Sequence, residues 1–80
     1  MKVYPNPALS SAMLEFSSEE GASYEIRVIN AQGKEMLLLS GTAQPGRNEQ
    51  QLNLDGMSQG LYIVQLLTNG QRRQLSLIRR

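Results

Sequence analysis

Apolar and polar residues alternate over short stretches of this chain, with the period of two that a half-buried β-strand requires. The clearest stretch is Ser23–Ile29, in which Tyr24, Ile26 and Val28 fall on one face. Turn residues separate it from similar stretches on both sides, and no segment has the 3.6-residue period of an amphipathic helix. The pattern therefore predicts an all-β protein.

Seven strands are expected, separated by turns that contain Gly, Pro or Asn. They are Lys2–Tyr4, Met13–Ser17, Ser23–Ile29, Lys34–Ser40, Arg47–Leu54, Leu61–Thr68 and Gln71–Ile78. Asn30–Gly33 suits a tight hairpin with Gly33 at positive φ, and Asn69–Gly70 is typical of a type I′ hairpin. The number and spacing of the strands predict an immunoglobulin-like antiparallel β-sandwich, with residues 1–80 as one domain.

Two apolar runs within these strands show little alternation. Met36–Leu39 is expected to be covered on both faces, and Gly41–Gly46 after it is expected to be a loop. Leu61–Thr68 is nearly continuous and is the best candidate for the middle of a sheet. Tyr62 near its start resembles the residue of a tyrosine corner, whose hydroxyl bonds to upstream backbone, so a structural role is expected for it.

The composition removes most catalytic chemistry. Histidine and cysteine are absent, and with them the commonest general base, the thiolate nucleophile and most zinc ligand sets. Glu19 and Glu20 are the only adjacent carboxylates, and neighbours on an exposed turn do not oppose each other across a cleft. Asp55–Gly56 lacks the further carboxylates of a calcium loop. We therefore expect no enzyme activity, no metal and no cofactor.

Positive charge is concentrated at one end of the chain. Residues 1–70 contain four Lys or Arg against seven Asp or Glu, whereas residues 71–80 contain four Arg and no acid. These arginines could contact an acidic partner, or they could only keep an edge strand from aggregating. Nucleic-acid binding is not expected, because the four aromatic residues are assigned to the core or to the corner. No run reaches the about 20 apolar residues of a membrane-spanning helix, so membrane insertion is not expected.

Three short motifs follow one another along the chain. They are Tyr4-Pro5-Asn6-Pro7 near the start, Gly33-Lys34 after the middle strand, and Gly60-Leu61-Tyr62 ahead of a final strand that ends in arginines. Each motif is weak alone, but their order and spacing are specific. Together they resemble the C-terminal sorting domain of the type IX, or Por, secretion system over essentially the whole chain.

The resemblance implies a tag at the C-terminus of a larger secreted protein. Such a tag would pass through the periplasm and be recognised by the outer-membrane translocon. A sortase-like peptidase commonly removes it, and the cargo is often attached to anionic lipopolysaccharide at the cell surface. In the family the last strand and its basic end are most associated with export, and they correspond here to Gln71, Arg72, Arg73, Leu75, Leu77, Ile78, Arg79 and Arg80.

A physical reason supports recognition of this last strand. A terminal edge strand presents unpaired N–H and C=O groups, so a partner strand could add to it while the arginines select an acidic groove. Protection of the edge, or a weak dimer through it, stays open as an alternative.

The other motif residues are expected to be structural. The two prolines would set the entry of the first strand and Tyr4 would close the end of the sandwich. Gly33, Lys34 and Gly60 would determine turns. The alternative function is a structural or carbohydrate-binding module that stays on the mature protein, and it would require an exposed aromatic platform.

Overall fold

The computed structural model describes residues 1–19 and 21–80, so the expectation about Glu20 lies outside the described residues. The described chain forms strands and no helix, which confirms the all-β prediction. The strands are β1 (Lys2–Tyr4), β2 (Ser11–Ser18), β3 (Ser23–Asn30), β4 (Glu35–Thr42), β5 (Gly46–Asn53), β6 (Gly60–Thr68) and β7 (Gln71–Arg79). Without helices, the described residues contain no helical segment able to cross a membrane.

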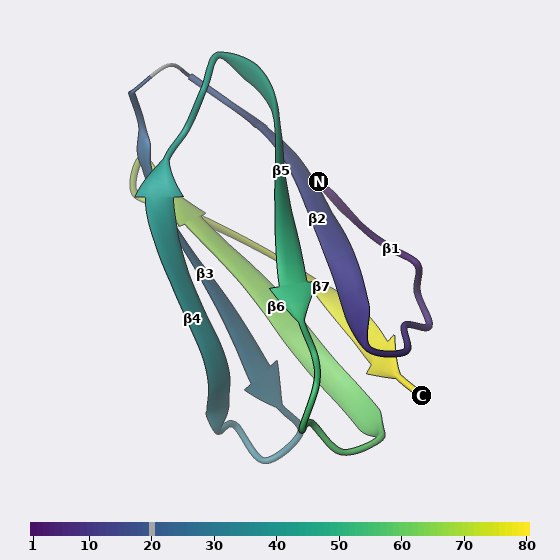
Figure 1. The fold of residues 1–80 in the computed structure, drawn as a ribbon. Helices are drawn as coiled ribbons and strands as arrows, with labels where there is room; N and C mark the ends of the chain where they lie inside the picture. The colour runs from purple at the N-terminus through teal and green to yellow at the C-terminus, as the bar shows by residue number, and fades with distance from the viewer. Residues whose placement is uncertain (20) are drawn as a thin grey trace.

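The strands form two antiparallel sheets that pack face to face as an immunoglobulin-like sandwich (Figure 1). One sheet has the order β1-β2-β5 and the other has the order β4-β3-β6-β7. β6 therefore lies inside the four-stranded sheet, as its nearly continuous apolar sequence predicts. β4 and β7 are the two edges of that sheet.

The core lies between the sheets and is built from alternate residues of their inner faces. Its largest fully buried side chains are Phe16, Leu14, Ile26, Leu52, Leu54, Leu66, Leu77, Val28 and Val64. Burial of each aliphatic side chain of this kind stabilises the fold by about 1.5–3 kcal/mol. Ile26 is paired with Leu66 and Val28 with Val64, so β3 and β6 form the centre of this packing.

Both hairpins expected from the sequence are present. Asn69 and Gly70 have φ values of 50° and 73°, the positive values that a type I′ turn requires. Gly33 has φ 88°, and its N–H donates to the Asn30 carbonyl at 2.9 Å. The Asn30 side chain also accepts the Lys34 N–H at 2.8 Å, which closes the turn between β3 and β4.

The expectation for Met36–Leu39 is wrong. β4 is an edge strand, and Leu38 on its outer face is 51% exposed. The strand also continues through Gly41 and Thr42, which the sequence predicts as a loop. This position requires glycine, because a Cβ at residue 41 would lie 2.6 Å from the Tyr24 hydroxyl oxygen. Every other predicted strand end lies within two residues of the observed one.

Candidate recognition strand

β7 is anchored in the sandwich by one face and open to solvent on the other. It pairs with β6 without interruption, from Gly60 opposite Arg79 to Thr68 opposite Gln71. Leu77 is fully buried and Leu75 packs against the core, whereas Ile78 lies on the exposed face. Of the residues expected to form the signal, Leu75 and Leu77 are thus placed in the core.

Two of the four arginines of this segment face inward. Arg73 is half-buried, and its Nη2 donates to the Ser17 carbonyl at 3.2 Å. The Nε of Arg79 donates to the Leu54 carbonyl at 3.4 Å. Ser17 belongs to β2 and Leu54 follows β5, so these two hydrogen bonds connect β7 to the three-stranded sheet.

Arg72 and Arg80 are exposed instead. Within residues 1–19 and 21–80, no ion pair involves Arg72, Arg73, Arg79 or Arg80. Arg27 and Arg47 differ, because Glu25 lies 2.7 Å from the first and Glu15 lies 2.6 Å from the second. The positive charge without an acidic partner in the described chain is therefore concentrated along β7.

The Tyr-Pro-Asn-Pro motif lies against the far end of β7, as Figure 1 shows for β1 and the segment after it. The Asn6 Nδ2 donates to the Ser76 carbonyl at 3.0 Å, and its Oδ1 accepts the Ile78 N–H at 2.9 Å. A side-chain amide carries a donor and an acceptor, so Asn6 takes the place of one peptide unit of a neighbouring strand.

Ala8 continues this pairing. Its N–H donates to the Ile78 carbonyl at 2.8 Å, and its carbonyl accepts the Arg80 N–H at 2.8 Å. Ala8 is fully buried and forms a parallel bridge with Arg79. The edge of β7 from Ser76 to Arg80 is therefore closed by the chain itself.

The other half of the same edge has no such cover. Along an edge strand, successive residues direct their N–H and C=O groups alternately toward the neighbour and away from it. Since the Ser76 carbonyl and the Ile78 N–H point away from β6, the backbone groups of Arg72 and Gln74 do so too. In the described part of the chain these groups have no hydrogen-bond partner.

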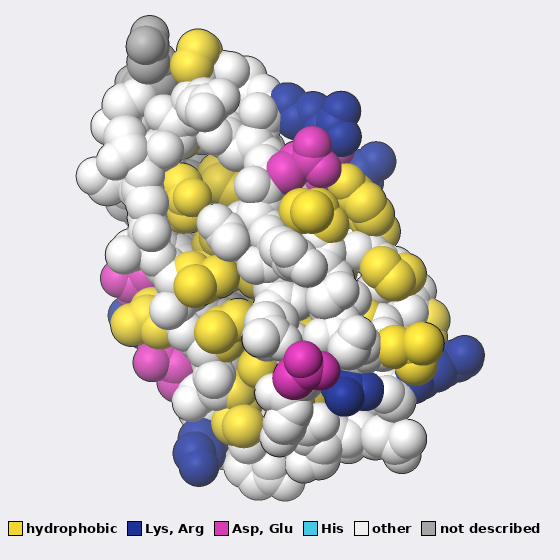
Figure 2. All heavy atoms as spheres, viewed as in Figure 1, with side chains coloured by type: hydrophobic (Ala, Val, Ile, Leu, Met, Phe, Trp, Pro, Cys, Tyr) yellow, Lys and Arg dark blue, Asp and Glu magenta, His cyan; other side chains and the backbone are white. Residues whose placement is uncertain are grey.

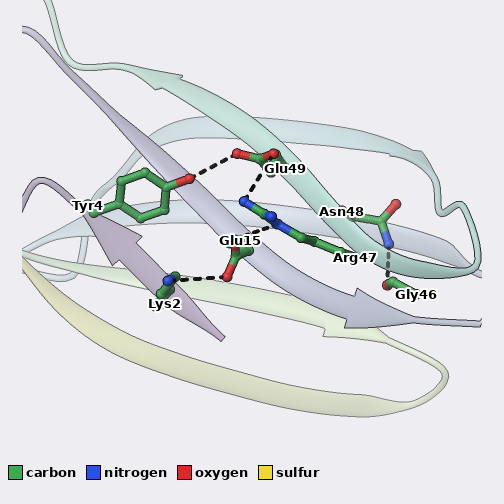
Figure 3. Close-up of polar contacts among 7 residues, drawn as sticks. All are labelled: Lys2, Tyr4, Glu15, Gly46, Arg47, Asn48 and Glu49. Atoms are coloured by element: carbon green, nitrogen blue, oxygen red, sulfur yellow. Dashed lines mark hydrogen bonds and ion pairs between the residues drawn. The ribbon is translucent and has the colours of Figure 1, made fainter.

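Tyr4 does not close the end of the sandwich, contrary to the expectation. It is 37% exposed on the three-stranded sheet, and its hydroxyl donates to Glu49 at 2.9 Å (Figure 3). Arg47 bridges Glu49 and Glu15, and Lys2 lies 3.5 Å from Glu15. The hydrogen bond to Glu49 raises the pKa of Tyr4, and the charge of Glu15 raises the pKa of Arg47. This cluster fixes β1 to β2 and β5.

The remaining motif residues form turns and a corner. The Tyr62 hydroxyl donates to the Ser58 carbonyl at 2.6 Å, which is the bond expected of a tyrosine corner. Gly60 before it has φ 149°, a conformation that favours glycine. Lys34 is exposed directly after the turn at Gly33. None of these residues lies on the open edge of β7.

Pro5 and Pro7 follow β1, so they direct the chain out of this strand and not into it. Their position delivers Asn6 to the end of β7. The contribution of Asn6 and Ala8 to the β7 edge is not predicted by the sequence. One feature of the sequence could have indicated it. Asn6 lies between two prolines, which lack a backbone N–H, so the asparagine side chain has to make the polar contacts of that turn.

The comparison with known proteins agrees with this arrangement. A family model described as "Secretion system C-terminal sorting domain" matches residues 2–79. No curated protein matched the chain. The resemblance noted from the three motifs is confirmed, and such a type IX signal implies export across the outer membrane, toward the cell surface or the medium. The chain belongs to the family of type IX secretion C-terminal sorting domains.

Proposed function

We propose that this domain is a non-catalytic export signal whose recognition surface is β7 with its basic end. The observation that carries the proposal is the concentration of arginines without an acidic partner on a strand with a half-open edge. Arg72 and Arg80 are the exposed charges that a receptor would meet first. Leu75 and Leu77 hold the strand in place for that contact.

The proposed course begins with a cargo chain in the periplasm. The outer-membrane translocon recognises the folded sandwich, a sortase-like peptidase then removes it, and the cargo is anchored to the cell surface. Met1 is exposed, so a cargo chain joined there leads away from the core without disturbing it. In this course every chemical step is carried out by the machinery and none by the domain.

The carboxylates of the domain support a non-catalytic role. In the described ranges, no three Asp or Glu side chains are grouped so that they could hold a metal ion. Glu15 and Glu49 are engaged by Arg47, and Glu15 also by Lys2. These carboxylates therefore contribute to holding β1, β2 and β5 together.

The aromatic residues do not favour a carbohydrate-binding module. Phe16 and Tyr62 are buried, and Tyr24 packs edge-on against Phe16 at 5.2 Å between ring centroids. Only Tyr4 among the described aromatic side chains is exposed, and its hydroxyl is engaged by Glu49. On the face seen in Figure 2, apolar side chains are interspersed with polar ones and form no flat platform.

The test is a fusion of a periplasmic reporter to residues 1–80, expressed in a bacterium with an active type IX system. The fusion is expected at the surface or in the medium, whereas the reporter alone stays in the periplasm. Retention of the intact fusion in a strain that exports its own cargo would contradict the proposal.

Removal of one charge tests the position of the signal. Arg72→Gln is expected to lower export by about tenfold, which corresponds to about 1.4 kcal/mol of binding free energy. Lys34→Gln is the matched control, because it also removes an exposed positive charge but lies at the β3–β4 turn. Equal export of the two variants would mean that β7 is not the recognition surface.

A further inference from the structure

We propose that the open half of the β7 edge, Gln71–Leu75, is completed during export by an extended acidic segment of a partner protein, which adds to the four-stranded sheet as a further strand. The inference rests on the proposed function and specifies how the signal is bound.

The backbone provides the first argument. Arg72 and Gln74 direct their N–H and C=O groups away from β6, and the described chain offers these groups no partner. From Ser76 onward, Asn6 and Ala8 occupy the same edge. A partner strand therefore has a defined place, which starts at the β6–β7 hairpin and ends where the N-terminal segment begins.

Other edges of the sandwich are less suited to this partner. On β5, the side chain of Gln50 donates to the Gln51 carbonyl, which points away from β2, at 3.0 Å. Carbonyls engaged in this way are less available to another strand. β4 is also an edge, but its sequence contains Glu35 and no basic residue.

Charge decides the kind of partner. Gln71–Arg79 contains three arginines and no acid, and Arg72 is exposed beside the open backbone groups. A second copy paired antiparallel through the same edge would place two such strands together, and like charges on neighbouring strands are destabilising. An acidic segment gains attraction in place of this repulsion, so an acidic extended partner fits the edge best.

The size of the edge indicates a reversible contact. Only Arg72 and Gln74 offer both of their backbone groups, so the added strand gains few hydrogen bonds. Short strand additions of this kind take their specificity from flanking side chains, here the exposed Arg72.

A proline at Gln74 tests the backbone contact in the export assay described above. Proline removes the N–H that a partner strand needs, and it is tolerated on an edge where that N–H faces solvent. Gln74→Pro is expected to fold and to lower export by about tenfold, the effect of about 1.4 kcal/mol.

The matched control is Ser40→Pro on β4. The Asn30 N–H donates to the Lys34 carbonyl, on the β4 side of β3. By alternation, the backbone N–H and C=O of Tyr24 also point toward β4, and those of its pairing partner Gly41 point toward β3. Ser40 beside Gly41 therefore points its N–H away from the sheet. Ser40→Pro is expected to fold and to be exported like the wild type.

Each outcome decides the inference. A folded Gln74→Pro fusion that is exported like the wild type overturns strand addition, while the proposed function stands as long as the intact fusion is exported. Folding is checked by thermal unfolding of residues 1–80, and Arg72→Pro is made as a second variant. If neither proline variant folds, the N–H groups at positions 72 and 74 are required by the fold, and the edge is not open.

Two further measurements test the nature of the partner. Arg72→Glu is expected to lower export by more than Lys34→Glu, and equal effects would overturn the acidic partner. Sedimentation of residues 1–80 is expected to show a monomer. A dimer that Gln74→Pro abolishes would show that a second copy occupies the edge, which overturns the inference.

Discussion

Asn6 and Ile78, which lie 72 residues apart in the sequence, are joined by a hydrogen bond of 2.9 Å from the Ile78 N–H to the Asn6 Oδ1. The same side chain donates to the Ser76 carbonyl at 3.0 Å. One asparagine of the Tyr-Pro-Asn-Pro motif thus serves the last strand of the domain. This contact gives the motif a structural role that its position near the other end of the chain does not suggest.

Replacement of Asn6 by alanine removes both bonds and leaves the edge of β7 uncovered there. We expect a loss of about 1–2 kcal/mol in the free energy of unfolding, because a single hydrogen bond contributes about 0.5–1.5 kcal/mol net. Urea denaturation measures the loss. Asn6→Asp keeps the acceptor for Ile78 but loses the donor for Ser76, so it should fall between the wild type and Asn6→Ala. No measurable change in Asn6→Ala would show that these bonds do not stabilise the edge.

Amide hydrogen exchange should distinguish the two halves of the β7 edge. The Gln74 N–H faces solvent and is expected to exchange fast, whereas the Leu75 N–H faces β6 and is expected to be protected. The Ile78 N–H also points away from β6, but Asn6 should slow its exchange. NMR measurement on residues 1–80 checks this order, and a protected Gln74 amide would contradict an open edge.

Gly41 should not tolerate a larger residue. In Gly41→Ala the new Cβ would lie 2.6 Å from the Tyr24 hydroxyl oxygen and 2.8 Å from its Cζ. Overpacking of this kind costs about 1–3 kcal/mol. Thermal unfolding measures the effect, and a double-mutant cycle with Tyr24→Phe should recover part of it because the hydroxyl is the nearest atom. Additive effects in that cycle would show that the Tyr24 hydroxyl is not the cause.

The hydrogen bond between Tyr4 and Glu49 predicts a dependence of stability on alkaline pH. The bond raises the pKa of Tyr4 in the folded state above 10.0, its ordinary value. The unfolded chain therefore loses the proton first, and the contribution is complete below pH 10 and is lost as the pH rises through the higher folded value. The stability difference between the wild type and Tyr4→Phe should accordingly decrease as the pH rises above 10. Urea unfolding between pH 8 and 11 measures it, and a difference that grows with pH would have the wrong sign.

Much of the fold could be predicted from local patterns. Asn69–Gly70 identifies its hairpin because both residues accept positive φ, and the apolar run of Leu61–Thr68 correctly predicts an inner strand. The prediction for Met36–Leu39 was wrong for a physical reason, since an apolar run looks the same in sequence whether or not both of its faces are covered. Leu38 lies on such an uncovered strand and stays exposed.

The arrangement of the candidate recognition strand was only partly predictable. The period of two already places Arg73 on the same face as Leu75 and Leu77, so its inward position could have been inferred from the alternation. The half-closed edge could not have been inferred in this way. It depends on Asn6 reaching Ile78, and no local pattern reports a contact between residues so distant in the chain.

The hydrogen bonds of Asn6 and Ala8 make the native structure depend on the residues at the end of β7. A polypeptide that stopped at Leu77 would lack the Ile78 and Arg80 groups to which Asn6 and Ala8 attach. The segment from Asn6 to Ala8 would then lose these bonds, although β1 would stay paired with β2, and the native contacts would be complete only after synthesis had reached Arg80. Prematurely terminated chains would thereby differ in shape from intact ones before any export machinery encountered them.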